Sequence, residues 1–182
     1  MILTKKDLKE YLKYEKRLYG LEKNSKYLMA KLINSQGYMI WKYQKNLRKS
    51  EYFYNRKNKI SKLIYFYYKK KLNKLGQLLG IEIKENCIKK GLRIFHSGSI
   101  IVNSKANIGE NCRIVGNVCI GNNKAEGGVP KIGDNVLIGV GAIIIGDIEI
   151  GDNIIIAAGS LVNKTFLEKG ITIGGIPAKK IK

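Results

Sequence analysis

Aliphatic side chains recur every six residues along the second half of the chain, from Val102 to Val162. A period of six fits neither the 3.6-residue turn of an α-helix nor the alternation of a half-buried strand, so it describes a repeat unit. The pattern is interrupted once, at residues 122–130. The repeat positions are Val102, Ile108, Ile114, Ile120, Ile132, Ile138, Ile144, Ile150, Ile156 and Val162.

A second set of small or apolar residues lies four positions after most repeat positions, which suits inward corners of the same unit. Three units would form a triangular coil of about eighteen residues, and parallel strand pairing would stack coils about 4.8 Å apart. The sequence therefore predicts a parallel β-helix of roughly four coils. The second set is Ala106, Cys112, Val118, Val136, Ala142, Ile148, Ile154 and Ser160.

Glycine directly follows five of the repeat positions. We expect the backbone to turn sharply there, where a Cβ atom would be a liability. The polar and glycine-rich segment 122–130 cannot continue the β-helix, so we expect it to project as a loop. The five glycines are Gly109, Gly121, Gly133, Gly139 and Gly151.

The first eighty residues have a different composition from the rest. All 11 tyrosines lie there, together with the only tryptophan, whereas sixteen of the 20 glycines lie between Gly91 and Gly175. Periodicity predicts three helical segments, at residues 8–18, 27–40 and 60–79. We therefore expect an α+β protein with two domains, a helical one at 1–80 and a β-helical one at 81–182.

Most of the positive charge belongs to the helical part. Residues 1–80 hold 21 Lys and Arg against five Asp and Glu, whereas the remainder holds 13 against nine. Such a surface is either a solvated basic face or a contact with an acidic polymer or an anionic membrane. No long apolar run or signal sequence is apparent, which predicts a cytoplasmic protein. The membrane alternative would add peripheral contact of the basic helices at the inner membrane face. No nucleic-acid recognition motif is apparent.

The three cysteines, Cys87, Cys112 and Cys119, show no CxxC spacing. Cys112 occupies an inward position of the repeat, so we expect all three to be small core residues rather than partners in a disulfide or metal site.

His96 is the only histidine and lies just before the regular repeat begins. An isolated histidine is more often structural than catalytic, but Gly98 and Ser99 make this part of the coil irregular. An imidazole titrates near neutrality and can remove a proton from a hydroxyl group as that group attacks. His96 is therefore the candidate general base.

The repeat of an aliphatic residue, Gly and a small residue resembles the hexapeptide-repeat acyltransferases over residues 81–182. The segment around His96 resembles the serine acetyltransferase branch, and the basic, tyrosine-rich front half resembles its capsular or exopolysaccharide O-acetyltransferases. The resemblance implies a left-handed β-helix, a homotrimer, and direct transfer from acetyl-CoA without a metal. It also implies that a carboxylate, here Glu82, orients the imidazole.

The same resemblance suggests which residues bind acetyl-CoA. The family's closing motif corresponds to residues 174–180, which places Pro177, Lys179 and Lys180 beside the coenzyme. Small outward residues would border the pantetheine groove, and the loop at 122–130 would cover a site between adjacent subunits. The groove residues are Gly139, Gly141, Ala157, Ala158 and Gly159.

The chain departs from serine acetyltransferases at two positions. Phe95 replaces the aspartate that precedes the catalytic histidine, and Gly128 and Val129 replace the Arg-His pair of the loop. Because unpaired buried charge is costly, we expect a neutral acceptor, a sugar hydroxyl, contacted by Phe95, Asn103 and Val129.

Three alternatives remain at this point: a serine O-acetyltransferase, an amino-sugar N-acetyltransferase, and a trimeric scaffold whose helices bind a membrane or partner. A zinc carbonic anhydrase of this fold is excluded, because it needs three protein ligands and the chain has one histidine.

Overall fold

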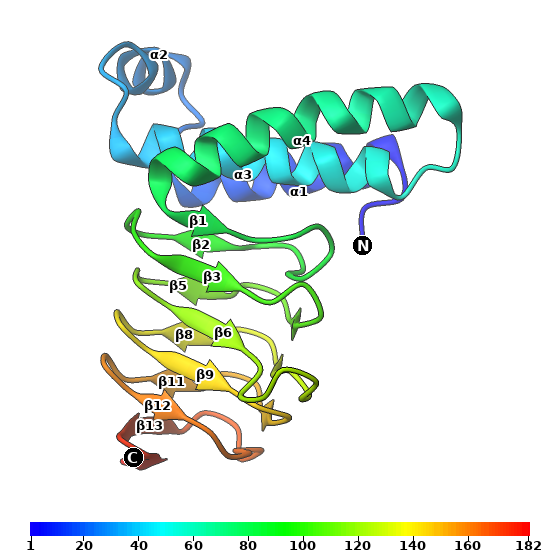
Figure 1. Ribbon diagram of the computed structural model, residues 1–182. Coiled ribbons are helices and arrows are strands. Elements are labelled where there is room, and N and C mark those ends of the chain that lie inside the picture. The colour runs from blue at the N-terminus through cyan, green and yellow to red at the C-terminus, as the bar shows by residue number, and fades with distance from the viewer.

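The computed structural model describes residues 1–182 as four helices above a prism of stacked strands (Figure 1). The helices are α1 (Lys5–Leu18), α2 (Asn24–Leu32), α3 (Gln36–Tyr54) and α4 (Lys59–Leu79). The expected segments 8–18 and 60–79 are confirmed as α1 and α4. None of the four helices combines the length and apolarity needed to cross a bilayer.

The expected helix at 27–40 is wrong, because the chain breaks between α2 and α3. Asn34 adopts a left-handed φ of 48°, and the hydroxyl of Ser35 accepts a hydrogen bond from the backbone N–H of Tyr38. A serine in this role starts a new helix. The new helix, α3, contains most of the buried helical residues and runs beneath α4 (Figure 1).

Fourteen short strands form the three faces of the prism, and all pairs are parallel except β13–β14. Sheet 1 has the order β1-β3-β6-β9-β12, sheet 2 the order β10-β7-β4, and sheet 3 the order β14-β13-β11-β8-β5-β2. The strands are β1 (Ile81–Glu82), β2 (Arg93–Ile94), β3 (Ile100–Val102), β4 (Asn107–Ile108), β5 (Arg113–Ile114), β6 (Cys119–Gly121), β7 (Lys131–Ile132), β8 (Leu137–Ile138), β9 (Ile143–Ile145), β10 (Glu149–Ile150), β11 (Ile155–Ile156), β12 (Leu161–Val162), β13 (Thr172–Gly175) and β14 (Ala178–Lys180).

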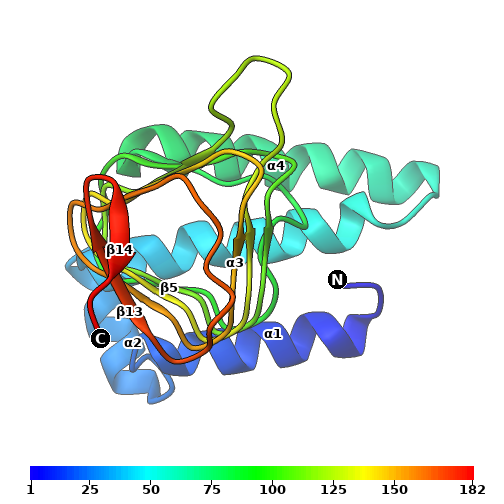
Figure 2. The same ribbon diagram turned by 90° about the horizontal axis from the view of Figure 1, so that it is seen from below.

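The predicted parallel β-helix is confirmed, and its core follows the six-residue repeat. Every repeat position is buried, and so is every member of the second inward set. Repeat positions stack in register from coil to coil, as Val102 does on Ile120 and Ile120 on Ile144. The loop at 122–130 projects from the stacked coils as expected, which is plain in the view along the prism (Figure 2).

Two of the cysteines are core residues as expected, and the third is not. Cys87 and Cys112 are buried, and burial raises the pKa of the Cys112 thiol to about 12. Cys119 precedes a repeat position on β6, so the alternation of the strand turns its side chain to the half-exposed outer face of sheet 1. The expectation of a core residue is wrong for Cys119.

The glycines after the repeat positions serve a different purpose from the one expected. None of the five has a left-handed φ angle. Instead, a Cβ atom at four of them would collide with the next coil. At Gly109 it would lie 2.5 Å from the carbonyl carbon of Gly133. Asparagines occupy several of the left-handed turn positions, where Asn is tolerated. The side chains of Asn111, Asn135 and Asn153 form a hydrogen-bonded ladder with N–O distances of 3.0 and 3.1 Å.

This difference predicts the effect of adding a methyl group at two glycines. Gly109→Ala is expected to lower the free energy of unfolding by about 1–3 kcal/mol, because two coils must move apart. Gly121→Ala is the matched control, since no atom lies within 4 Å of the place that its Cβ would take and its φ is ordinary. Urea unfolding would measure both, and equal losses at the two sites would contradict the stacking explanation.

Side chains of α1 and α3, together with Tyr19, form hydrogen bonds with the open backbone edge of the first coil. The Gln44 amide donates to the carbonyl oxygen of Leu92 at 2.9 Å, and the Tyr43 hydroxyl accepts from the N–H of Ile83 at 3.1 Å. The Tyr19 hydroxyl accepts from the N–H of Ile94 at 3.3 Å. An exposed strand edge invites unwanted pairing, so the helices act as a cap. The hydrophobic core is continuous across this junction.

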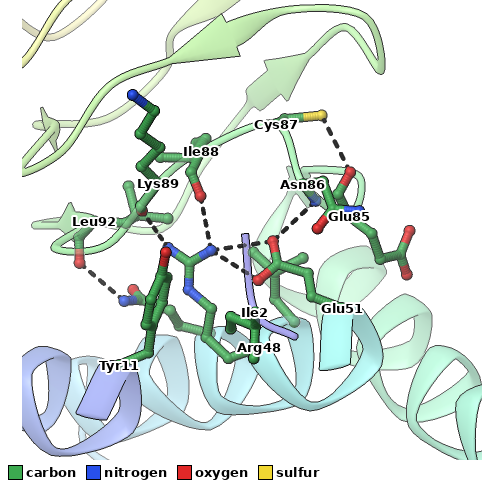
Figure 3. A network of polar contacts seen from close by, with 12 residues as sticks. Ile2, Tyr11, Arg48, Glu51, Glu85, Asn86, Cys87, Ile88, Lys89 and Leu92 are labelled. Carbon is green, nitrogen blue, oxygen red and sulfur yellow. Dashed lines mark hydrogen bonds and ion pairs between the residues drawn. The ribbon is translucent and has the colours of Figure 1, made fainter. Parts of the chain in front are cut away.

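A buried ion network centred on Arg48 completes the cap (Figure 3). Its guanidinium lies 2.8 Å from the carboxylate of Glu15 and 2.9 Å from that of Glu51, and it donates to the carbonyl oxygens of Ile88 and Lys89. Burial lowers the pKa of Arg48, but the two carboxylates more than offset this and raise it above its usual value. The network therefore joins α1, α3 and the first coil through a permanent charge.

Candidate active site at the prism corner

His96 lies at the corner where the chain passes from β2 on sheet 3 to β3 on sheet 1. Its backbone N–H donates to the carbonyl oxygen of Val115 at 3.0 Å, which fixes the corner to the coil below, while its side chain is exposed. Gly98, two residues on, adopts a φ of 143°, so the corner departs from the regular repeat as expected.

The nearest polar partner of the imidazole comes from α3. The Gln36 amide oxygen lies 3.4 Å from Nδ1 of His96, and the Gln36 amide nitrogen donates to the hydroxyl of Ser97 at 3.1 Å. Gln36 is the first residue of the helix that Ser35 caps. If Nδ1 carries the proton and donates to Gln36, Nε2 is left as the basic nitrogen.

Glu82 does not occupy the expected role beside the imidazole. Its carboxylate lies 3.2 Å from the Lys84 ammonium, and no hydrogen bond joins it to His96. Residues i and i+2 of an extended segment share one side of the chain, which explains this pairing. Gln36 was missed from the sequence because no periodicity or motif connects it with a histidine sixty residues away.

Small residues continue the corner below His96. A Cβ atom added to Gly116 would lie 3.5 Å from Cβ of His96, and the N–H of Gly141 donates to the carbonyl oxygen of Gly116 at 3.1 Å. The N–H of Gly159 donates in turn to Val140 at 2.8 Å. His96 and the expected groove residues thus share one corner, where short side chains let a ligand approach the backbone. We call residues 116, 139, 141 and 157–159 the corner column.

The C-terminal hairpin lies against the lower end of the corner column. A Cβ atom at Gly174 of β13 would lie 2.9 Å from Cβ of Ala157. Pro177 is exposed in the turn between β13 and β14. Lys180 lies 2.5 Å from the carboxylate of Glu168, whereas Lys179 is exposed and forms no ion pair.

The expected acceptor residues lie at two different corners of one chain. Phe95 is next to His96, where its ring packs on the guanidinium of Arg93 at 5.0 Å. Asn103 follows β3 at the opposite edge of sheet 1 and donates to the side chain of Asn122, at the base of the loop that contains Val129. One chain therefore does not bring Phe95 together with Asn103 and Val129.

The contact between Gln36 and His96 yields a testable prediction. Gln36→Glu is expected to shift the pH dependence of kcat/KM towards higher pH, because a carboxylate stabilises the protonated imidazole and so delays its action as a base. Gln36→Met, of similar size and uncharged, is the control and should lower activity without this shift. Identical pH profiles for the two variants would contradict a direct contact.

Comparisons with known proteins agree with the repeat. Residues 130–164 match the family model described as bacterial transferase hexapeptide (six repeats). This segment of the chain is therefore similar to the hexapeptide repeat of bacterial transferases. No curated protein matches the chain.

Solved structures similar to this hexapeptide-repeat chain include three of serine acetyltransferases. The Brucella abortus enzyme has a TM-score of 0.74 at 21% identity over 97% of this chain and 70% of its own. The same enzyme in complex with coenzyme A has a TM-score of 0.71 at 23% identity over 97% and 68%. The Neisseria gonorrhoeae enzyme in complex with serine has a TM-score of 0.70 at 26% identity over 98% and 70%. The expected fold class, helices followed by a hexapeptide-repeat β-helix, is confirmed.

Proposed function

We propose that the chain is an acetyl-CoA-dependent O-acetyltransferase in which His96 is the general base. The observation that carries this proposal is the position of His96 at the head of the corner column. Nδ1 of its imidazole lies 3.4 Å from the amide oxygen of Gln36, and the side chain is exposed to an incoming acceptor. The family repeat and the serine acetyltransferase fold support the same reaction class.

In the proposed reaction, Nε2 of His96 takes the proton of the acceptor hydroxyl while its oxygen attacks the thioester carbonyl carbon. The tetrahedral intermediate then expels the sulfur of coenzyme A, which receives the proton from the imidazolium. An ester forms and a thioester breaks, so no acyl-enzyme is required. Positioned general-base catalysis of this kind typically contributes about 10²–10⁴-fold, and backbone N–H groups of the corner would stabilise the oxyanion.

The corner column is the proposed donor site. Its small residues, Gly139, Gly141 and Ala157 to Gly159, would border the pantetheine arm, with Pro177 and Lys179 at the lower end. Lys179 supplies an unpaired positive charge for a coenzyme phosphate. The solved coenzyme A complex of a protein with this fold supports the choice of donor.

A homotrimer would complete the proposed site. The loop at 122–130 and Asn103 lie at the opposite corner of sheet 1 from His96, so only a neighbouring copy can bring Val129 to the imidazole. The outer face of sheet 1 supports such contact, because Ile101 and Ile143 are 47% and 43% exposed on it. Apolar surface of this kind is typical of subunit interfaces.

For the acceptor, the comparisons favour the serine hydroxyl, one of the alternatives from the sequence, over the sugar hydroxyl expected there. The three similar structures are all of serine acetyltransferases, and one contains serine. The N-acetyltransferase and scaffold alternatives receive no comparable support.

One observation still favours a neutral hydroxyl, such as that of a sugar, as the second candidate. The side chain beside His96 is Phe95, which offers no carboxylate for an ammonium group, and residues 127–129 of the loop offer no guanidinium for a carboxylate. A zwitterionic acceptor would therefore leave its charges poorly paired.

Labelled acetyl-CoA supplied with L-serine, methyl glucoside or glucosamine separates these candidates. O-acetyl products are cleaved by alkaline hydroxylamine, whereas N-acetyl products are not. Serine as the best acceptor supports the first candidate, and methyl glucoside the second. Label found only in hydroxylamine-stable product would contradict O-acetyl transfer itself.

A further inference from the structure

A groove of about 1000 Å³ lies between α3 and α4, with Tyr27 of α2 at its edge. This volume is at the upper end of the roughly 300–1,000 Å³ of small-molecule sites. It belongs to the helical part of the chain and includes neither His96 nor the corner column.

The charge of the groove is entirely positive. None of its 15 lining residues is acidic, and five are lysines. The ammonium groups of Lys42, Lys45 and Lys74 form no ion pair or hydrogen bond, so they remain available to a ligand. The five lysines are Lys42, Lys45, Lys49, Lys71 and Lys74. The lining therefore favours an anionic occupant.

Other side chains already cover ring faces of Tyr67 and Tyr68 in the groove. Tyr68 stacks on Phe53 with ring centroids 5.7 Å apart, and the Lys49 ammonium lies 4.8 Å from the Tyr68 centroid. The Lys71 ammonium covers Tyr67 at 4.2 Å. Nucleic-acid bases bind single-strand sites by stacking on free ring faces. The groove offers few such faces, which argues against an oligonucleotide.

What the groove presents instead is a set of polar groups around an apolar floor. The side-chain nitrogen of Asn46 donates to the carbonyl oxygen of Lys42 at 2.6 Å, and its side-chain oxygen accepts no hydrogen bond. The Gln77 amide is exposed, whereas Trp41, which also lines the groove, is only 3% exposed. Hydroxyl groups of a ligand pair well with such amides and phenols.

We propose that this groove binds an acidic carbohydrate, a sugar whose carboxylate or phosphate supplies the negative charge. Its hydroxyl groups meet the amides and phenols, and its anionic groups meet Lys42, Lys45 and Lys74.

The groove also lies next to a cavity that reaches the corner with His96. Gln77 and Leu78 line both this groove and a second cavity of about 790 Å³, which reaches Ser97, Gly98 and Ser99 next to His96. A sugar chain held in the groove would thus extend towards the corner. Binding itself does not depend on the proposed acetyl transfer.

The only tryptophan of the chain lies in the groove, so its fluorescence reports occupancy without acetyl-CoA. The full-length protein would be titrated with a galacturonate oligomer, glucose 6-phosphate, a neutral maltose oligomer, a thymidine oligonucleotide and anionic vesicles. We expect a saturable change with one or both acidic sugars and none with the neutral one; which of the two responds identifies the anionic group. No response to either, an equal response to the neutral oligomer, or a response only to oligonucleotide or vesicles would overturn the proposal.

Paired variants separate a site from general attraction. Lys45→Gln with Lys74→Gln is expected to weaken binding of the acidic sugar at least about tenfold, since charge-assisted hydrogen bonds are lost. Lys59→Gln with Lys62→Gln removes the same charge from exposed positions of α4 outside the groove and should change affinity far less. Equal weakening by both pairs would overturn a specific site. Thermal unfolding of each variant verifies that it is folded.

Discussion

Replacing His96 with alanine is expected to lower kcat/KM for acetyl transfer by about 10²–10⁴-fold, the usual contribution of a positioned general base. Hydroxyl groups are too weakly acidic to ionise at neutral pH, and His96 is the only histidine in the chain. The exposed side chain makes no contact in the buried core, so the variant should fold normally. Steady-state release of coenzyme A with a saturating acceptor would measure the loss.

Donor affinity is the control for this variant. The imidazole lies at the head of the corner column rather than within it, so acetyl-CoA should bind His96→Ala about as well as it binds the wild type. Unchanged turnover in this variant would remove His96 from the mechanism. A loss of turnover accompanied by an equal loss of acetyl-CoA affinity would instead assign it to donor binding.

Replacing Arg48 with methionine is expected to lower the free energy of unfolding by about 3–5 kcal/mol, because two buried carboxylates lose their partner. Glu15 and Glu51 are 0% and 2% exposed, so solvent does not replace the lost partner without a change in structure. The backbone carbonyl groups of Ile88 and Lys89 would also lose a donor. Urea unfolding monitored by circular dichroism would measure the change.

Lys131→Met is the matched control, since it removes one partner of an exposed ion pair. The side chains of Lys131 and Glu149 are 62% and 51% exposed, and such pairs contribute at most about 1 kcal/mol. If Arg48→Met cost no more than this control, the network would not hold the helices on the first coil.

The β-helix could be predicted from the sequence because each unit repeats one local rule. One residue of each unit, such as Ile120, must face the inside of the coil. The six-residue period of these positions is therefore visible in the sequence without knowledge of any distant contact. The second inward set and the loop at 122–130 follow from the same rule. The exact role of the glycines does not, because a clash such as that of Gly109 with Gly133 arises only when two coils are stacked.

The junction between helices and prism could not be predicted, because it depends on contacts between residues far apart in the chain. Arg48 in a lysine-rich segment has no sequence feature that marks it as buried, and Gln36 has none that connects it with His96. Ser35 was the one available signal for the start of α3. Family resemblance alone placed Glu82 beside the imidazole, whereas the structure pairs it with Lys84.

Acetyl-CoA is proposed to bind along the corner below His96, and the most direct measurement is calorimetric titration of acetyl-CoA into the wild-type protein. We predict saturable binding with a dissociation constant between about 1 μM and 1 mM, the range in which enzymes commonly meet their substrates. Absence of any binding heat at millimolar acetyl-CoA would contradict the account.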